Sequence, residues 1–299
     1  MLFYPKICHG GCHGGCHCKK EKKKSFPDRK TVYLNIFDDY DICYSEKDKK
    51  KGQDYLCGWH FDSHPGRPTI VFFHGTTGNI TDRAYIINFC NRFSVNLFVF
   101  DYSGYGESGN NPSKAFLKEN ADTVYNYLRR GAHLKNKDIV LWSESLGCFS
   151  ASYLCSKHKF RACILMSAFS SLDDILLYKT EEGYKRTCVG LVTNILSWKM
   201  DFLPVKFYLR EAKCKVVVVH SKHDDLIDYE CAKINYDSIV TRKKMVTIGG
   251  AHSSPIITKE QLKEVFHFCD LDHEVPSNSI SRMLHSMETY AQRHDNFLR

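Results

Sequence analysis

The chain has 299 residues, a length that fits one large domain or two small ones. Hydrophobic residues make up 43% of the sequence, which is ample for a buried core. The formal net charge is +8, but the basic excess is concentrated in residues 1–51, so we expect no nucleic-acid partner for the body of the chain.

The sequence shows neither a membrane-spanning segment nor a secretion signal. No stretch approaches the ~20 apolar residues of a membrane span, and the N-terminus lacks the apolar core of a signal peptide. Of the 14 cysteines, ten are scattered through apolar contexts without the spacing of a disulfide framework. This is typical of reduced thiols, so we expect a cytoplasmic protein that is not secreted.

Residues 1–30 form a separate arm that contains the run CHGGCHGGCHC and then a lysine cluster. We expect this arm to be disordered, because it has almost nothing to pack. Its function has three explanations: an acylated anchor at the cytoplasmic face of a membrane, soft-metal binding through thiols and histidines, or a plain tail. We favour the anchor and predict no metal site, since structural zinc ligands usually come in two separated pairs. The acylation candidates are Cys8, Cys12, Cys16 and Cys18.

Short apolar segments alternate with helical patterns along the rest of the chain. Strands are predicted at residues 31–37, 55–61, 69–73, 95–100, 139–142, 162–166, 216–220 and 244–248. Helices are predicted at residues 81–93, at 113–130 with Ser113 as N-cap, after Ser145, from about 229, and at 259–269. A charged hairpin loop is expected at residues 46–52, a small lid at about 170–207, and a polar tail at 271–299 with a helix near 281–293.

This alternation predicts an α/β fold in residues 31–270, with a mostly parallel sheet, helices on both faces and an antiparallel strand pair at the start. In such sheets functional residues gather at the carboxyl ends of the strands. Glycine-rich turns follow Phe73, Phe100 and Ile248, each at such an end.

Ser145 lies in the pattern Ser143-Glu144-Ser145-Leu146-Gly147, between an apolar strand and a helical segment. This is the small-x-Ser-x-small form of a nucleophile elbow, a tight turn that presents a serine at the end of a strand. The usual pattern has glycine at position 143, and a serine there is still small enough for the turn.

A base and an acid are needed to activate such a serine. His252 follows the glycines of the loop at 249–252, after the last predicted strand. Asp224 follows the strand that ends at His220, and Asp225 and Asp228 compete with it, since any of the three could simply cap the next helix.

With these motifs the chain resembles the α/β-hydrolase superfamily over about residues 54–270. His74-Gly75-Thr76 is similar to the superfamily's oxyanion turn, Asp101-x-x-Gly104-x-Gly106-x-Ser108-Gly109 matches the turn after the fourth strand, and the order Ser, Asp, His is the one this fold uses. Within the superfamily it resembles most the small-lidded group that includes protein depalmitoylases. The segment from His220 to Ile227 is similar to the acid-bearing motif of that group, with Ser221 in place of glycine.

The resemblance implies an α/β-hydrolase fold and a serine hydrolase that needs no cofactor. Ser145 would be the nucleophile, His252 the base and Asp224 the acid, and the backbone amides of Thr76 and Leu146 would bind the oxyanion. We expect a monomer that cleaves an ester or thioester of an acyl chain on a small molecule or a protein. The alternatives are a peptidase or amidase with the same triad, a non-catalytic protein that keeps the fold, and a metal-binding protein that uses the N-terminal arm.

Overall fold

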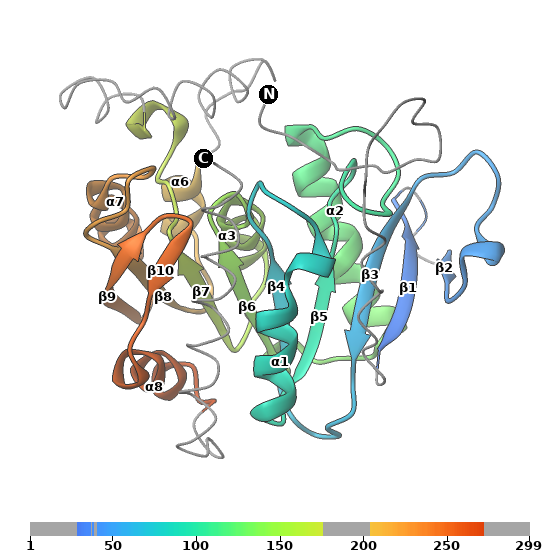
Figure 1. Cartoon of the computed structure of the whole chain (residues 1–299), viewed down its shortest axis with the longest axis horizontal. Helices are drawn as coiled ribbons and strands as arrows, with labels where there is room; N and C mark the ends of the chain where they lie inside the picture. The colour runs from blue at the N-terminus through green and yellow to red at the C-terminus, as the bar shows by residue number, and fades with distance from the viewer. Residues whose placement is uncertain (1–28, 37, 39–40, 176–203, 272–299) are drawn as a thin grey trace, which may run out of the picture.

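The computed structural model describes residues 29–36, 38, 41–175 and 204–271 (Figure 1). The cysteine-rich arm, most of the expected lid and the expected helix near residues 281–293 therefore lie outside the described residues. Among the residues that are described, no helix has the length and apolar character needed to cross a bilayer.

The described residues form one ten-stranded sheet that passes through the whole molecule (Figure 1). Its strand order is β10-β9-β8-β7-β6-β4-β5-β3-β1-β2. Strands β4 to β9 pair in parallel, whereas β1, β2, β3 and β10 pair with their neighbours antiparallel. The strands are β1 Lys30–Asn35, β2 Ile42–Cys43, β3 Tyr55–Phe61, β4 Thr69–Phe73, β5 Asn96–Phe100, β6 Ile139–Glu144, β7 Ala162–Met166, β8 Lys215–Ser221, β9 Lys243–Ala251 and β10 Ser254–Ile256.

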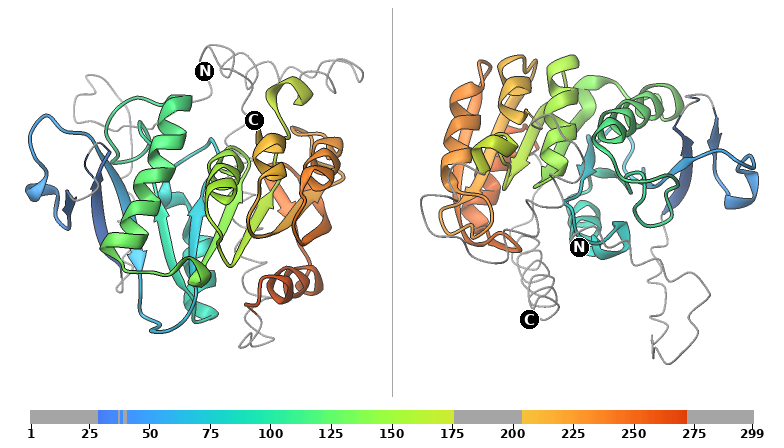
Figure 2. Two further views of the ribbon diagram at one scale, coloured as in Figure 1. Left: turned by 180° about the vertical axis from the view of Figure 1, so that it is seen from behind. Right: turned by 90° about the horizontal axis from the view of Figure 1, so that it is seen from above.

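Helices cover both faces of this sheet, α1 and α8 on one and α2, α3, α6 and α7 on the other (Figures 1 and 2). The helices are α1 Ala84–Arg92, α2 Lys114–Asn126, α3 Gly147–Lys157, α6 Val205–Arg210, α7 Tyr229–Ser238 and α8 Lys259–Phe268. Because the central strands are buried on both faces, their residues are apolar without alternation, and each face of the sheet has its own core. The expected mostly parallel α/β fold is therefore confirmed.

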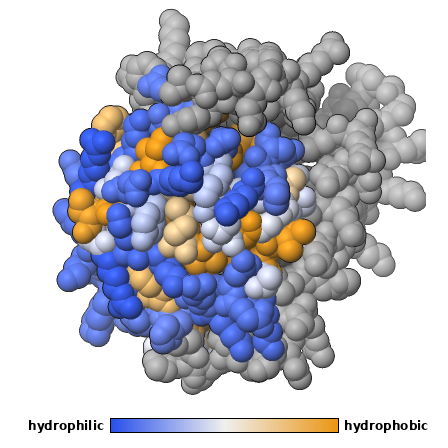
Figure 3. Space-filling view, turned by 90° about the vertical axis from the view of Figure 1, so that its left-hand side faces the viewer, coloured by the Kyte–Doolittle hydropathy of each residue, from blue (hydrophilic) through white to orange (hydrophobic). Residues whose placement is uncertain are grey.

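The surface that faces the viewer in Figure 3 is mainly hydrophilic, with apolar residues in small separate groups. The described residues include four large hydrophobic side chains that are exposed, and these are Tyr44, Phe207, Val240 and Ile256. Single exposed apolar residues of this kind are normal for a globular domain.

The structure corrects three of the predicted element boundaries. The helix predicted at 113–130 does begin with Ser113 as N-cap, but regular α-helix ends at Asn126 and one wider π-helical turn, Tyr127–Gly131, follows. The helix predicted at 81–93 begins later, at Ala84, after a short 3-10 turn at Ile80–Asp82. The charged loop predicted at 46–52 needs no such correction, although Glu46–Asp48 within it forms a 3-10 turn.

The third correction concerns the loop predicted at 249–252. Strand β9 continues to Ala251 and turns back at once into β10, so that Ala251 pairs with Ser254 and His252 lies in a two-residue hairpin turn. Because glycines are typical of loops, the sequence pattern did not indicate that the strand continues here. Gly250 has a φ of 84°, and a Cβ atom there would lie 2.2 Å from the Ser254 carbonyl oxygen, so the hairpin needs glycine at this position.

Candidate active site

Ser145 occupies a tight turn between β6 and α3, at the carboxyl end of the sheet's central strands. Its φ is 49°, a left-handed conformation that is strained for a residue with a side chain. The turn is held by the Ser145 N–H, which donates to the Met166 carbonyl at 3.0 Å. Ser143, which replaces the usual glycine, is buried and donates from Oγ to the Ile164 carbonyl at 2.9 Å. The serine is therefore accommodated within the sheet.

His252 reaches Ser145 from the turn between β9 and β10. Its Nε2 atom lies 3.1 Å from Ser145 Oγ, and its Nδ1 atom lies 2.8 Å from Asp224 Oδ2. Ser145 and His252 are both partly exposed, so the hydroxyl and the imidazole can meet a molecule from solvent. The structure thus brings the predicted nucleophile, base and acid into one chain of hydrogen bonds.

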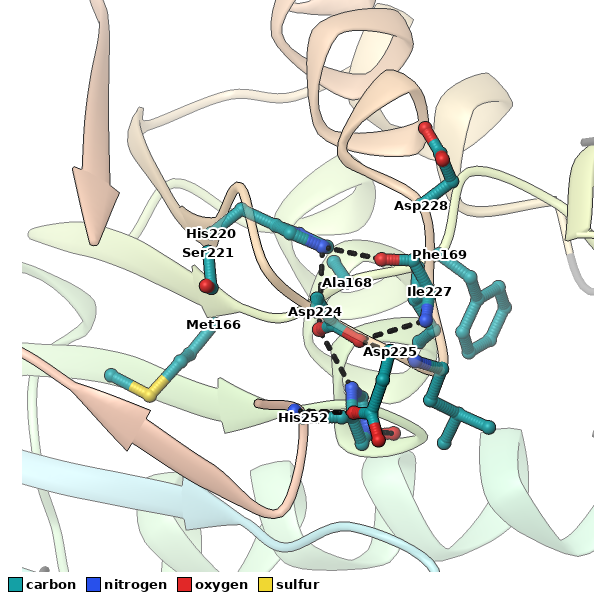
Figure 4. A network of polar contacts seen from close by, with 12 residues as sticks. Met166, Ala168, Phe169, His220, Ser221, Asp224, Asp225, Ile227, Asp228 and His252 are labelled. Carbon is teal, nitrogen blue, oxygen red and sulfur yellow. Dashed lines mark hydrogen bonds and ion pairs between the residues drawn. The ribbon is translucent and has the colours of Figure 1, made fainter. Parts of the chain in front are cut away.

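The three aspartates that competed for the role of acid make different contacts (Figure 4). Asp224 contacts the imidazole of His252 through Oδ2. Asp225 accepts the backbone N–H of His252 at 3.0 Å and so holds the hairpin turn. Asp228 caps α7 by accepting the Glu230 N–H at 2.7 Å. The geometry therefore selects Asp224 as the candidate acid.

The Asp224 carboxylate is buried and fully engaged. Its Oδ1 atom accepts the N–H groups of Leu226 at 2.9 Å and Ile227 at 2.8 Å. Burial alone would raise the pKa of Asp224, but the charge and hydrogen bond of His252, together with the Ile227 N–H, lower it below the ordinary value. Asp224 is therefore ionised at neutral pH.

The two amides predicted to bind an oxyanion flank Ser145. Leu146 is the residue immediately before α3, so its N–H is at the N-terminal end of that helix. Thr76 follows Gly75, whose added Cβ would lie 3.5 Å from Ser145 Cβ, which places this backbone beside the serine. Within the described part of the chain, neither of these two N–H groups donates a hydrogen bond.

A polar cluster that the sequence did not reveal holds the turn at residues 74–78. Tyr105 donates to the Thr76 carbonyl at 3.2 Å, and Arg83 donates to the Thr77 carbonyl. The His74 imidazole is buried beneath the turn with Nδ1 2.7 Å from the Gly75 carbonyl, and burial lowers its pKa. His74 therefore supports the turn from below, and Arg83 and Tyr105 carry no sequence motif that indicates their contacts with it.

Glu144, the residue before Ser145, is a second feature that sequence reasoning missed. Each of its carboxylate oxygens lies 2.7 Å from the Tyr85 hydroxyl of α1. Burial raises the pKa of Glu144, against the effects of Arg83, Tyr85 and His252. Its place inside the elbow pattern is the only sequence signal that could have drawn attention to it.

Comparisons with known proteins agree with this fold. Residues 68–187 match the family model described as alpha/beta hydrolase fold. The uncharacterized protein YfhR of Salmonella typhi is 29% identical over 253 residues, which are 72% of this chain and 85% of that protein. Protein bem46 of Schizosaccharomyces pombe is 34% identical over 118 residues, 38% of this chain and 40% of its own. Alpha/beta hydrolase domain-containing protein 17C of Homo sapiens is 25% identical over 214 residues, 71% of this chain and 60% of that protein.

Solved structures share the fold at low identity. An esterase of Pyrococcus furiosus, Pf2001, matches with a TM-score of 0.62 and 16% identity, over 81% of this chain and 89% of its own. An alpha-beta hydrolase of Vibrio vulnificus matches with a TM-score of 0.55 and 16% identity, over 81% and 79% of the two chains. Together with the family-model match and the relatives, these likenesses confirm the resemblance that the motifs indicated: the chain has the α/β-hydrolase fold and is similar to proteins of the α/β-hydrolase superfamily.

Proposed function

We propose that this protein is a serine hydrolase in which Ser145 is the nucleophile, His252 the general base and Asp224 the orienting acid. The observation that carries the proposal is the continuous contact from Ser145 Oγ to His252 Nε2 at 3.1 Å and from His252 Nδ1 to Asp224 Oδ2 at 2.8 Å. Both distances are within the reach expected of a nucleophile and its base, and of that base and its orienting group.

The reaction begins when His252 Nε2 takes the proton of the Ser145 hydroxyl as Oγ attacks the carbonyl carbon of the substrate. Asp224 stays ionised, keeps the second imidazole proton on Nδ1 and stabilises the imidazolium that forms. His252 then gives its new proton to the departing alcohol or thiol, which leaves an acyl group on Ser145. Water, deprotonated by His252, attacks this acyl-enzyme and releases the carboxylic acid together with free Ser145.

The tetrahedral intermediates of both steps carry a negative oxygen. We assign its stabilisation to the N–H groups of Leu146 and Thr76, which are not used in other hydrogen bonds among the described residues. In other enzymes, a fixed donor of this kind stabilises the transition state by about 2.7–4 kcal/mol, because it needs no reorganisation when the negative charge develops.

The proposed substrate is an ester or thioester of an acyl chain. Support comes from the superfamily, from the likeness to a protein named as an esterase, and from relatives that include alpha/beta hydrolase domain-containing protein 17C. A better leaving group makes ester and thioester carbonyls easier to cleave than amides, so the same triad would act on amides more slowly.

The experiment that tests the proposal is labelling with a fluorophosphonate probe under native conditions. The wild-type protein should be labelled and Ser145→Ala should not, because the probe reacts only with an activated serine. Ser253→Ala, which alters a serine adjacent to His252, is the matched control and should still be labelled. An unlabelled wild-type protein, or labelling that survives Ser145→Ala, contradicts the mechanism.

Leaving-group preference is tested separately by comparing the kcat/KM values of the wild-type protein for one acyl chain joined as a p-nitrophenyl ester, as a thioester and as an anilide. We expect the ester and the thioester to be cleaved and the anilide to be cleaved at least tenfold more slowly. A preference for the anilide would favour the peptidase or amidase alternative.

The acyl anchor stays a prediction, because Cys8, Cys12, Cys16 and Cys18 lie outside the described residues. Metabolic labelling with a palmitate analogue should give a hydroxylamine-sensitive signal that is lost when the four cysteines are replaced by serine. Zinc or copper in the purified protein, with no acyl signal, would support the metal-binding explanation for the arm instead.

A further inference from the structure

A second histidine lies directly behind the acid of the candidate triad. His220, at the end of β8, is completely buried, and its ring packs edge-on against Tyr229 at 6.0 Å between centroids. Its Nε2 atom is 3.0 Å from the Ile227 carbonyl oxygen and 3.4 Å from Asp224 Oδ2 (Figure 4). The mechanism described above gives this residue no task.

The contacts of His220 close a ring around the acid. The Ile227 N–H donates to Asp224 Oδ1 at 2.8 Å, and the Ile227 carbonyl faces His220 Nε2. The backbone N–H of Ile227 thus binds Asp224, and its backbone carbonyl binds His220. The loop between β8 and α7 cannot shift Asp224 without breaking one of these two hydrogen bonds.

The geometry also fixes the form of the His220 ring. A carbonyl oxygen can only accept, so Nε2 must carry a proton to bond to Ile227. No hydrogen-bond partner faces His220 Nδ1 among the described residues, and a second proton there would be a buried N–H without an acceptor. His220 is therefore neutral with its proton on Nε2.

The electrostatic surroundings of His220 also favour the neutral ring. Burial lowers the pKa of His220, and the nearby His252 adds to that effect, while Asp224 and Asp228 oppose it. A neutral ring leaves the full charge of Asp224 available to His252, whereas a cationic one would compete with His252 for that charge.

We propose that His220 is a positioning residue of the triad, whose Nε2–H group fixes the Ile227 peptide and through it the direction of the Asp224 carboxylate toward His252. This rests on the proposed function, because Asp224 matters only if Ser145 and His252 react. His220 touches no reacting atom, so its loss should slow the chemical step and leave substrate binding nearly unchanged.

The test compares two variants that place an amide N–H at different points. The side chain of His220→Gln brings its amide nitrogen close to the position of Nε2, whereas His220→Asn brings it only as far as Nδ1. For hydrolysis of a p-nitrophenyl ester we expect His220→Asn to lower kcat about 10–100-fold, by analogy with the loss of a residue that orients a metal ligand in metalloenzymes. KM should change less than about threefold, and His220→Gln should recover most of kcat.

Each outcome bears on a different claim. If the wild-type protein neither hydrolyses the ester nor reacts with a fluorophosphonate, the proposed function fails, and this inference fails with it. If the wild type is active but His220→Asn keeps its kcat, or if Gln and Asn lower kcat equally in folded proteins, the positioning role alone is overturned.

A measurement on the wild-type protein covers the case in which the variants do not fold. Nitrogen-15 NMR of the histidine rings should show His220 as a neutral ring protonated at Nε2 at pH 7. A ring protonated at Nδ1, or a charged ring, would contradict the inference without any substitution.

Discussion

At the scale of single residues, Gly147 sets how closely the turn after Ser145 can approach the sheet. A Cβ atom at this position would lie 2.2 Å from the Phe73 carbonyl oxygen and 2.9 Å from that of His74, both of them backbone atoms that cannot move aside. The elbow and the oxyanion turn are therefore in direct contact, and only glycine permits this.

Gly147→Ala should accordingly destabilise the protein by about 1–3 kcal/mol or more, as forced overpacking does elsewhere. The matched control is Gly249→Ala, because an added Cβ there meets nothing closer than 4.0 Å. Urea unfolding of the two variants measures the difference. Equal stability of both would show that the turn can move away from β4.

The same residues show what the sequence could predict of the site. Ser145, His252 and Asp224 are separated by up to 107 positions, yet each follows a strand, and strand ends of a parallel sheet meet at one edge. The role of His220 could not be predicted in this way. Its neutrality depends on burial and on the direction of one backbone carbonyl, which only the folded loop determines.

At the scale of elements, an ion pair joins the segment after β7 to α6. Lys206 Nζ lies 3.0 Å and 2.8 Å from the two carboxylate oxygens of Asp174, which also accepts from Ser170 Oγ at 2.6 Å. The side chains of Lys206 and Asp174 are only 21% and 12% exposed. Removal of the lysine would leave a largely buried carboxylate without its cation.

We expect Lys206→Met to lower the free energy of unfolding by about 1–3 kcal/mol, because the cost of an unpaired buried charge exceeds that of a lost surface contact. Lys233→Met is the control: Lys233 pairs with Glu230, but these side chains are 54% and 39% exposed, so its replacement should destabilise the protein much less than Lys206→Met does.

The pH dependence provides a second check on this pair. Burial raises the pKa of Asp174, but Lys206 and Ser170 lower it further, so its folded-state pKa is below the ordinary value. Stability from such a group is present above the unfolded-state pKa and is lost as the pH falls through the folded-state pKa. The difference between wild type and Lys206→Met should therefore shrink in acid, and a constant difference would argue against the ion pair.

Elements were predicted well where the apolar pattern was continuous and less well where glycine interrupted it. The buried runs of β4, β5, β6 and β7 indicated strands because both faces of a central strand are apolar. The end of β9 was missed because Gly249 and Gly250 are typical of loops, whereas here Gly250 permits a close turn into β10.

At the scale of the whole molecule, the sheet buries several histidines as neutral rings, and this couples stability to pH. His60 on β3 is 5% exposed, with Nδ1 2.8 Å from the Tyr127 hydroxyl and its ring edge-on to Phe98. Burial lowers the pKa of His60 to about 4. His74 and His220 are also buried, and burial lowers the pKa of each.

The sign of the effect follows from which state binds the proton. In the unfolded chain a histidine takes up a proton as the pH falls through about 6.5, whereas folded His60 does so only near pH 4. The unfolded state therefore binds more protons between these two values. As the pH falls through this range, the free energy of unfolding should decrease by about 1.4 kcal/mol for each pH unit and each such histidine.

Urea unfolding of the wild-type protein from pH 7 to pH 4.5 should show this loss. His60→Gln should reduce the slope of the free energy of unfolding against pH by the contribution of about one proton. The control variant is His133→Asn, at an exposed position where φ is 55°, since asparagine tolerates that backbone conformation. His74 and His220 should maintain a residual slope in both variants. If His60→Gln leaves the slope unchanged, His60 takes up its proton in the folded protein as it does in the unfolded chain, and the effect assigned to its burial is wrong.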